Sequence, residues 1–185
     1  MVAGLIIMLV VFGAVAGYFI AIYNGIVTLK NRVENGWAQI DTQLQRRFDL
    51  IPNLVETVKG YAKHESEVFD RITTARSNTL NAKSITDKAA ADTEMSGALK
   101  SLFAVAEAYP VLQASANFKE LQVELTNTEN RIAFSRQFYN DSVARLNTAK
   151  QKFPHSMIAD RMHIETYPYY EVDSAEVRAT PKISF

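Results

Sequence analysis

The sequence predicts an all-α protein in which an N-terminal transmembrane helix continues into an antiparallel bundle of long helices, followed by an extended C-terminal tail. Only seven Gly and five Pro occur in 185 residues, so few positions can interrupt helices. The first side chain that is charged at neutral pH is Lys30. Beyond the apolar start, apolar residues recur every three or four positions, the period of a helix with one buried face. These features divide the chain into an anchor (1–25), a bundle (26–153) and a tail (154–185).

The composition argues against several classes of function. The 20 Lys and Arg residues balance the 20 Asp and Glu residues, so there is no basic excess to attract nucleic acid. The chain contains no Cys, which excludes disulfides, thiolate metal sites and cysteine nucleophiles. We therefore expect neither nucleic acid as a partner nor a cofactor.

The anchor is predicted from the segment between Val2 and Tyr23, which has no charge, Asn, Gln or Pro. At about 1.5 Å per residue, a helix of this length spans a hydrocarbon core of about 30 Å. Gly13 and Gly17 have the G-x-x-x-G spacing that lets spanning helices pack closely. A cleaved signal peptide, with Ala14-Val15-Ala16 as its cleavage pattern, is the rival interpretation. Signal peptides begin with basic residues, and none precedes this apolar run.

The orientation follows from the basic residues around the span. Lys30, Arg32, Arg46 and Arg47 follow the span, whereas only the α-amine precedes it. Basic residues favour the cytoplasmic side of a membrane. We therefore expect a single-pass protein with its N-terminus outside and its bundle in the cytoplasm.

The first bundle helix is predicted to break at Pro52. Its apolar stripe comprises Ile26, Leu29, Val33, Trp37, Ile40, Leu44, Phe48 and Ile51. Pro52 lacks the N–H that a helix interior needs, and its ring crowds the carbonyl of Phe48. Because proline suits the first turn of a helix, we expect a turn or kink with a second helix beginning here.

Three further helices complete the predicted bundle. The second helix ends in a connection over Asn78–Thr86, where Thr86 or Asp87 is expected to cap the third helix. Pro110 ends the third helix. The fourth helix begins near Ser115 and keeps its apolar register to Phe153.

The tail is predicted to be extended, or to form weak strands. It holds three of the five prolines and the cluster Tyr167-Pro168-Tyr169-Tyr170. Tyrosines combine apolar rings with polar tips, which suits either a lipid headgroup layer or a groove between subunits. We favour oligomerisation through the tail and the spanning helix; the alternative is that the tail covers the bundle of its own chain.

No catalytic motif is found. His64-Glu65 begins like the zinc motif H-E-x-x-H, but position 68 is Val68. No Glu-x-x-His occurs, so the di-metal pattern of four-helix bundles is absent from the sequence. Inward glutamates are instead expected to pair across the bundle. The glutamates concerned are Glu65, Glu107, Glu120, Glu124 and Glu129, and the arginines are Arg46, Arg47, Arg76, Arg131 and Arg136.

Polar and aromatic residues cluster around Pro52 and along the fourth helix. Solvated faces explain many of them, but repeated Asn disfavours a helix, so some are expected to contact neighbouring helices or a partner. The candidate interaction or structural residues are Arg46, Arg47, Asp49, Pro52, Asn53, Tyr61, Tyr109, Pro110, Arg131, Arg136, Tyr139 and Asn140.

The run from Arg46 to Tyr61, followed by His64-Glu65, resembles the signature of the LemA family. The similarity continues in Glu107-Ala108-Tyr109-Pro110 and in Thr128-Glu129-Asn130-Arg131-Ile132. This resemblance implies a single-pass protein of the bacterial cell membrane with a helical bundle and no known catalysis. Relatives include a magnetosome membrane protein, which implies a role in membrane organisation.

Together these features favour a non-enzymatic membrane scaffold or adaptor that acts through protein–protein contacts or self-assembly. Its expected partners are the lipid bilayer, other membrane or membrane-associated proteins and further copies of itself. A membrane-remodelling protein and a metal-assisted enzyme are the alternatives.

Overall fold

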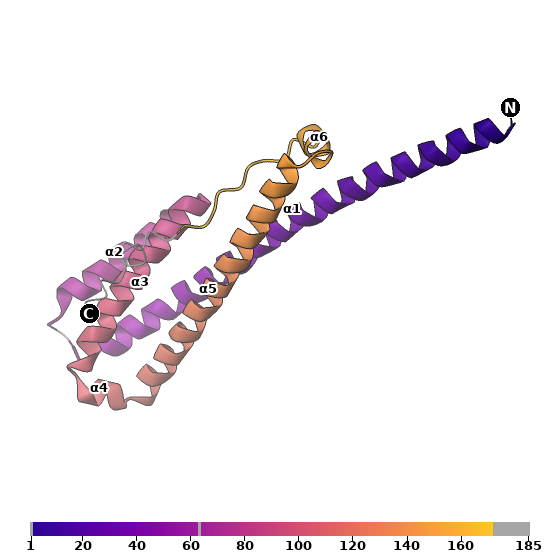
Figure 1. The fold of residues 1–185 in the computed structure, drawn as a ribbon. Helices are drawn as coiled ribbons and strands as arrows, with labels where there is room; N and C mark the ends of the chain where they lie inside the picture. The colour runs from indigo at the N-terminus through magenta and orange to yellow at the C-terminus, as the bar shows by residue number, and fades with distance from the viewer. Residues whose placement is uncertain (1, 63, 172–185) are drawn as a thin grey trace, which may run out of the picture. The chain divides into compact units, whose positions relative to one another are not determined.

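A computed structural model describes residues 2–62 and 64–171, and it confirms the all-α fold class. Its helices are α1 (Val2–Lys59), α2 (Ser66–Asn81), α3 (Ile85–Glu107), α4 (Pro110–Ala114), α5 (Ala116–Gln151) and α6 (His155–Arg161), as Figure 1 shows. No strand occurs among the described residues. The part of the predicted tail from 172 to 185 lies outside them.

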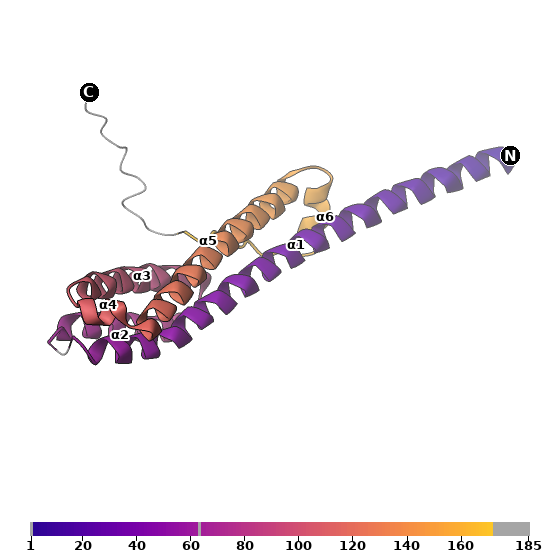
Figure 2. The same cartoon turned by 90° about the horizontal axis from the view of Figure 1, so that it is seen from below.

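The chain forms two compact units, and α1 and α5 contribute to both. The first unit combines Met1–Ala38 with Arg136–Tyr167, and the second combines Gln39–Ser135 with the chain from Pro168. In the first unit, α5 runs antiparallel to α1 (Figures 1 and 2). The second unit holds α2, α3 and α4 together with the remaining parts of the two long helices.

The predicted break at Pro52 is wrong, because α1 continues through this residue to Lys59. A proline in a helix interior costs about 3 kcal/mol. Ile51, Leu54 and Val58 lie on the buried stripe of the same helix and are at most 1% exposed. Burying each such side chain contributes about 1.5 to 3 kcal/mol, so tertiary packing exceeds the local penalty.

The chain reverses later than predicted, between Gly60 and Glu65, before α2 begins at Ser66. The connection between α2 and α3 is also shorter than predicted. Ser84 caps α3 in place of Thr86 or Asp87, and Asp87 completes a reciprocal capping box with Ser84. Hydrogen bonds with Ser84 lower the pKa of the Asp87 carboxyl.

Proline also acts differently from prediction at the later breaks. Helix α3 ends at Glu107, and Pro110 is the first residue of the short helix α4, where its missing N–H costs nothing. The tail begins with a helix, α6, and not with the predicted extended segment. Ala159 of α6 is 1% exposed, so packing stabilises this helix of about two turns. From Ile164 to Glu171 the chain has no regular secondary structure.

The core of the second unit joins all five of its helices. The apolar side chains that form it are Ile51, Leu54, Val58, Ala62, Phe69, Ile72, Ala75, Met95, Ala98, Leu99, Leu102, Ala106, Leu112, Phe118, Leu121 and Leu125. The α2 and α3 contributions recur every three or four residues, as the sequence predicts for amphipathic helices.

The first unit depends on a close approach of α1 and α5 at Gly36. A Cβ atom added there would lie 3.1 Å from Phe138 Cδ1 and 3.1 Å from the Cα of Tyr139. Gly36 is buried, whereas Trp37, which the predicted stripe used instead, is half-buried. Trp37 packs edge-on against Tyr139 with ring centroids 6.1 Å apart.

The N-terminal part of α1 is the one segment among the described residues that is long and apolar enough to cross a membrane. Its most apolar window is only 6% buried, so this surface requires a lipid or protein environment. A Cβ atom added at Gly13 or Gly17 would meet nothing within 4 Å.

Replacing Gly36 by Ala is expected to destabilise the first unit by about 1 to 3 kcal/mol, because the added methyl group meets backbone that cannot move cheaply. Thermal unfolding of the full chain in detergent, followed by circular dichroism, measures the change. Gly97→Ala is the matched control: Gly97 also lies within a helix, but an added Cβ meets nothing within 4 Å. The control is expected to gain about 0.5 to 1 kcal/mol. A stabilising Gly36→Ala would contradict the close approach.

Replacing Pro52 by Ala is expected to raise the midpoint of thermal unfolding. The change restores the N–H donor for the Phe48 carbonyl and removes a penalty of about 3 kcal/mol, less the contacts of the half-buried ring. Pro110→Ala provides the comparison, because Pro110 occupies a first-turn position that needs no donor. A lower midpoint for Pro52→Ala than for Pro110→Ala would show that packing of the ring outweighs the helical bond.

Candidate functional site

The second unit contains a buried charge at Arg47. The buried positions of α1 in this unit recur in steps of four and three residues, and they are Ile40, Leu44, Arg47, Ile51, Leu54 and Val58. This spacing places all six on one face of the helix. Arg47 is 5% exposed, so its guanidinium must find partners inside the protein.

Those partners come from α3 and α5. Nη1 of Arg47 donates to Asp92 Oδ1 at 2.6 Å, and Nη2 donates to Ser96 Oγ at 3.0 Å. The same guanidinium pairs with Glu129 of α5. One side chain of α1 is thereby bonded to two other helices.

Asp92 also holds the chain that follows α6. The Tyr170 hydroxyl donates to Asp92 Oδ2 at 3.0 Å, and Tyr170 is 3% exposed. At this residue the tail covers the bundle of its own chain, which is the alternative to the subunit groove considered from the sequence.

The electrostatic balance makes this cluster a structural constraint. The Arg47 and Asp92 side chains are 6% and 2% exposed, and without Arg47 the Asp92 carboxylate would be an uncompensated buried charge. Removing one partner of such a pair costs about 3 to 5 kcal/mol, whereas replacing both by apolar groups is often neutral. The pair therefore favours one register of the helices over others.

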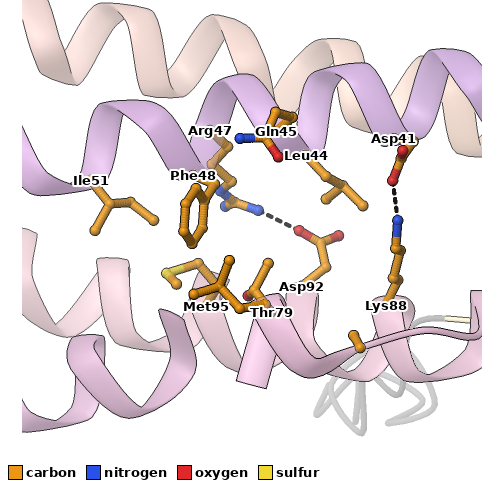
Figure 3. Close-up of a pocket in the computed structure, with 12 residues that line it drawn as sticks. Asp41, Leu44, Gln45, Arg47, Phe48, Ile51, Thr79, Lys88, Asp92 and Met95 are labelled. Atoms are coloured by element: carbon orange, nitrogen blue, oxygen red, sulfur yellow. Dashed lines mark hydrogen bonds and ion pairs between the residues drawn. The ribbon is translucent and has the colours of Figure 1, made fainter. Parts of the chain in front are cut away.

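A small cavity adjoins the pair (Figure 3). Leu44, Phe48, Ile51 and Met95 supply apolar walls, and the ion pairs Arg47–Asp92 and Asp41–Lys88 lie beside them. Its volume is about 180 Å³. Ligand pockets typically measure about 300 to 1,000 Å³. The cavity suits a small molecule at most and is too small for a nucleotide-sized cofactor.

The expected pairing of arginines with glutamates across the bundle is present at two positions. Arg47 pairs with Glu129, and Arg46 pairs with Glu124 at 3.0 Å between Nη2 and Oε2. The second pair is solvent-exposed, with side chains 48% and 39% accessible, so its contribution to stability is small.

The other candidate residues near Pro52 lie at the surface of α1. Asp49 is exposed and accepts a hydrogen bond from Gln45 at 2.8 Å. Asn53 is exposed as well, and its carbonyl accepts from the Thr57 hydroxyl at 2.7 Å.

A second group lies where α1, α2 and α4 meet their loops. Tyr61 is 45% exposed, and Pro110 is exposed at the start of α4. The Tyr109 hydroxyl donates to Glu65 at 3.3 Å. Desolvation, together with the Glu65 carboxylate, raises the pKa of Tyr109. His64, whose neighbour Glu65 suggested a zinc motif, is exposed in the turn before α2.

The remaining candidates lie on α5. Arg131 is exposed in the second unit, whereas Arg136, Tyr139 and Asn140 belong to the first unit. Tyr139 is completely buried, and this burial raises its pKa to about 12. It is therefore a packing residue.

Tyr167 completes the first unit from the tail side. Its hydroxyl donates to Glu34 at 3.2 Å. Desolvation, with the nearby Glu34 carboxylate, raises the pKa of Tyr167 to about 12. Lys150 Nζ holds the same segment by donating to the carbonyl of Ile164 at 2.9 Å.

A comparison with protein families shows the family of this chain. The family model described as LemA family matches residues 36–185. The chain belongs to the LemA family.

Curated relatives of this LemA-family chain carry magnetosome names. They include the magnetosome protein MamQ of Magnetospirillum gryphiswaldense and the magnetosome proteins MamQ 1 and MamQ 2 of Paramagnetospirillum magneticum. Each is 27% identical over a match that covers 74% of this chain. The chain spans 60% of the length of these relatives. The long apolar helix and this membership together identify a membrane-associated protein.

The sequence did not predict Asp92 and Ser96 as site residues, and it did not predict the bond from Tyr170 to Asp92. A signal for Asp92 exists: continuing the predicted α3 stripe of Met95, Leu99 and Leu102 one turn back reaches position 92, so an acidic residue stands on an apolar face. No comparable signal marks Tyr170, because the path of the tail is not encoded in a local period. Among residues 2–62 and 64–171, no group of three or more His, Asp or Glu side chains is placed to hold a metal ion.

Replacing Arg47 by Met is expected to lower the free energy of unfolding by about 3 to 5 kcal/mol, because Asp92 is left charged and buried. Adding Asp92→Leu should recover much of this loss, since the pair is then apolar. Denaturant unfolding of the full chain in detergent measures both. Arg46→Met, which breaks the exposed pair with Glu124, is the adjacent control and should cost less than about 1 kcal/mol. Equal losses at positions 46 and 47 would exclude the assigned role of Arg47.

Proposed function

We propose that this LemA-family protein is a non-enzymatic single-pass membrane scaffold that acts by binding further copies of itself. Helix α1 holds the bundle at the membrane. It runs without a linker from the apolar segment into the bundle, where it supplies a buried stripe. Basic residues after the span favour a cytoplasmic bundle.

The observation that carries the proposal is an exposed strip on α5. Val123, Asn127, Asn130 and Phe134 recur in steps of four, three and four residues, which places them on one helix face. Phe134 is 74% exposed and Val123 is 59% exposed. Large apolar side chains that share one face with uncharged polar ones are typical of protein interfaces.

The strip suits a second copy of the same chain. It carries no charge, so two copies that meet face to face through it bring no like charges together. Anchoring confines the copies to one membrane. Gly13 and Gly17 stand on the unburied part of α1 with open space around them, which permits two spans to pack closely.

A structural role also accounts for the charged residues of the bundle. Arg47 and Asp92 bind each other, and the cavity beside them holds about 180 Å³. The relatives named as magnetosome proteins agree with a role in building or organising a membrane structure, and we extend this role to the present chain as part of the proposal.

A photo-crosslinking amino acid at Phe134 tests the proposal in native membranes. We expect a crosslinked product of about twice the 20.7 kDa mass of the chain. The matched control carries the same probe at Val111, an apolar residue of α4 that is 70% exposed but lies off the strip. Phe134→Asp should remove the association, because it would place two carboxylates opposite each other.

Three outcomes would contradict the proposal. Monomer alone from the Phe134 probe would leave the strip without a protein partner. Equal dimer from both probe positions would indicate random encounter. A product of another mass would replace self-assembly by an adaptor that binds a different protein.

A further inference from the structure

The exposed aromatic residues of α1 mark the level at which its span ends. Tyr18 and Tyr23 are 54% and 49% exposed, and the first side chain that is charged at neutral pH follows at Lys30. Tyrosine is enriched where hydrocarbon meets the headgroups. The boundary therefore lies near Tyr23.

The end of α5 reaches this same level. Gly36 lies against Tyr139, and the two helices are antiparallel in the first unit. Twelve residues beyond Tyr139 is Gln151, the last residue of α5, and twelve residues before Gly36 is Asn24. Because both helices rise about 1.5 Å per residue, Gln151 lies level with the end of the span.

Burial along α1 agrees with this register. Ile22 is 5% exposed and Ile26 is completely buried, whereas Ile20 is 60% exposed. Burial of α1 side chains within the first unit therefore begins at the last turn of the span. Both views place α6 beside α1, at the end of α5 that lies nearer the N-terminus of α1 (Figures 1 and 2).

The turn from α5 into α6 carries two large apolar side chains that the described part of the chain leaves exposed. Phe153 is 80% exposed and Met157 is 59% exposed. In water, this exposure next to the span would be unfavourable. A lipid environment at the level of Tyr23 would remove these side chains from water.

The charge around this turn is positive although the whole chain is neutral. Between positions 144 and 167 there are four basic residues, Arg145, Lys150, Lys152 and Arg161, and two acidic residues, Asp160 and Glu165, with His counted as neutral. Lys152 and Arg161 are both exposed. Basic residues near a membrane surface attract anionic headgroups.

We propose that the α5–α6 turn, residues 151–162, is a second membrane contact that lies in the headgroup layer of the leaflet next to the bundle. Phe153 and Met157 enter the acyl boundary, and Lys152 and Arg161 bind anionic phosphates. This inference rests on the membrane anchoring of the proposed function, but not on self-assembly through the α5 strip.

Spin labels on the full chain test the immersion. The chain contains no Cys, so Met157→Cys gives a single labelling site. The labelled protein is reconstituted in vesicles of phosphatidylcholine and phosphatidylglycerol, and collisions of the nitroxide with oxygen and with a water-soluble nickel chelate are measured. We expect the ratio of oxygen to nickel collisions to be several-fold higher at position 157 than at the control Val111→Cys.

Two further measurements test whether the contact requires anionic lipid and the two basic side chains. The ratio at 157 should fall in vesicles of phosphatidylcholine alone, and Lys152→Gln with Arg161→Gln should remove this dependence on anionic lipid. Phe134→Asp should leave the ratio unchanged, because the strip on α5 is not involved.

The readings separate the possible failures. A label at 157 that collides with nickel as often as the Val111 control overturns the inference, provided that Ile7→Cys reports lipid. Nickel access at Ile7 would overturn the anchor and the inference with it. A label at 157 shielded from both reagents would indicate burial in protein, and would equally exclude the lipid contact.

Discussion

The buried guanidinium of Arg47 is the constraint on which the bundle depends. A charge with 6% of its side chain exposed must be neutralised inside the protein, so α1, α3 and α5 can pack only in registers that bring Asp92 and Glu129 to it. Apolar contacts alone tolerate sliding by a heptad, because one leucine replaces another. The bond from Tyr170 extends the same constraint to the chain after α6. Hydrophobic burial thus supplies the stability of the second unit, and the ion pair selects its register.

Apolar periodicity predicted the fold class and most helices, because each long helix buries one face along its whole length. The prediction failed where a local rule was opposed by a larger tertiary energy. Pro52 satisfies every local criterion for a break, yet the stripe that continues through Ile51 and Leu54 outweighs it. The stripe itself was displaced by one residue at two places, Trp37 for Gly36 and Phe48 for Arg47, because a search for apolar residues passes over a glycine chosen for close approach and an arginine chosen for pairing.

The part of the site that could be predicted from the sequence is its pairing of oppositely charged side chains. Arginines and glutamates on facing helices predict ion pairs, and Arg46–Glu124 and Arg47–Glu129 are two of them. Asp92 could have been found from its place on an apolar face. Tyr170 could not, because its position depends on where the chain after α6 returns, and no local period encodes that path.

The use of the tail tyrosines determines which surfaces remain for partners. The Tyr167 hydroxyl donates to Glu34, and Lys150 donates to the carbonyl of Ile164 in the same unit. Tyr170 is buried, and its hydroxyl donates to Asp92. Both hydroxyls and one ring are therefore used within the chain, so a subunit groove built from them would require these bonds to break. Phe134 and Phe153 are 74% and 80% exposed, and a phenylalanine side chain has no donor or acceptor that an internal hydrogen bond could use. An interface that uses them loses no internal hydrogen bond on forming, which favours association through α5 and membrane contact at the turn before α6.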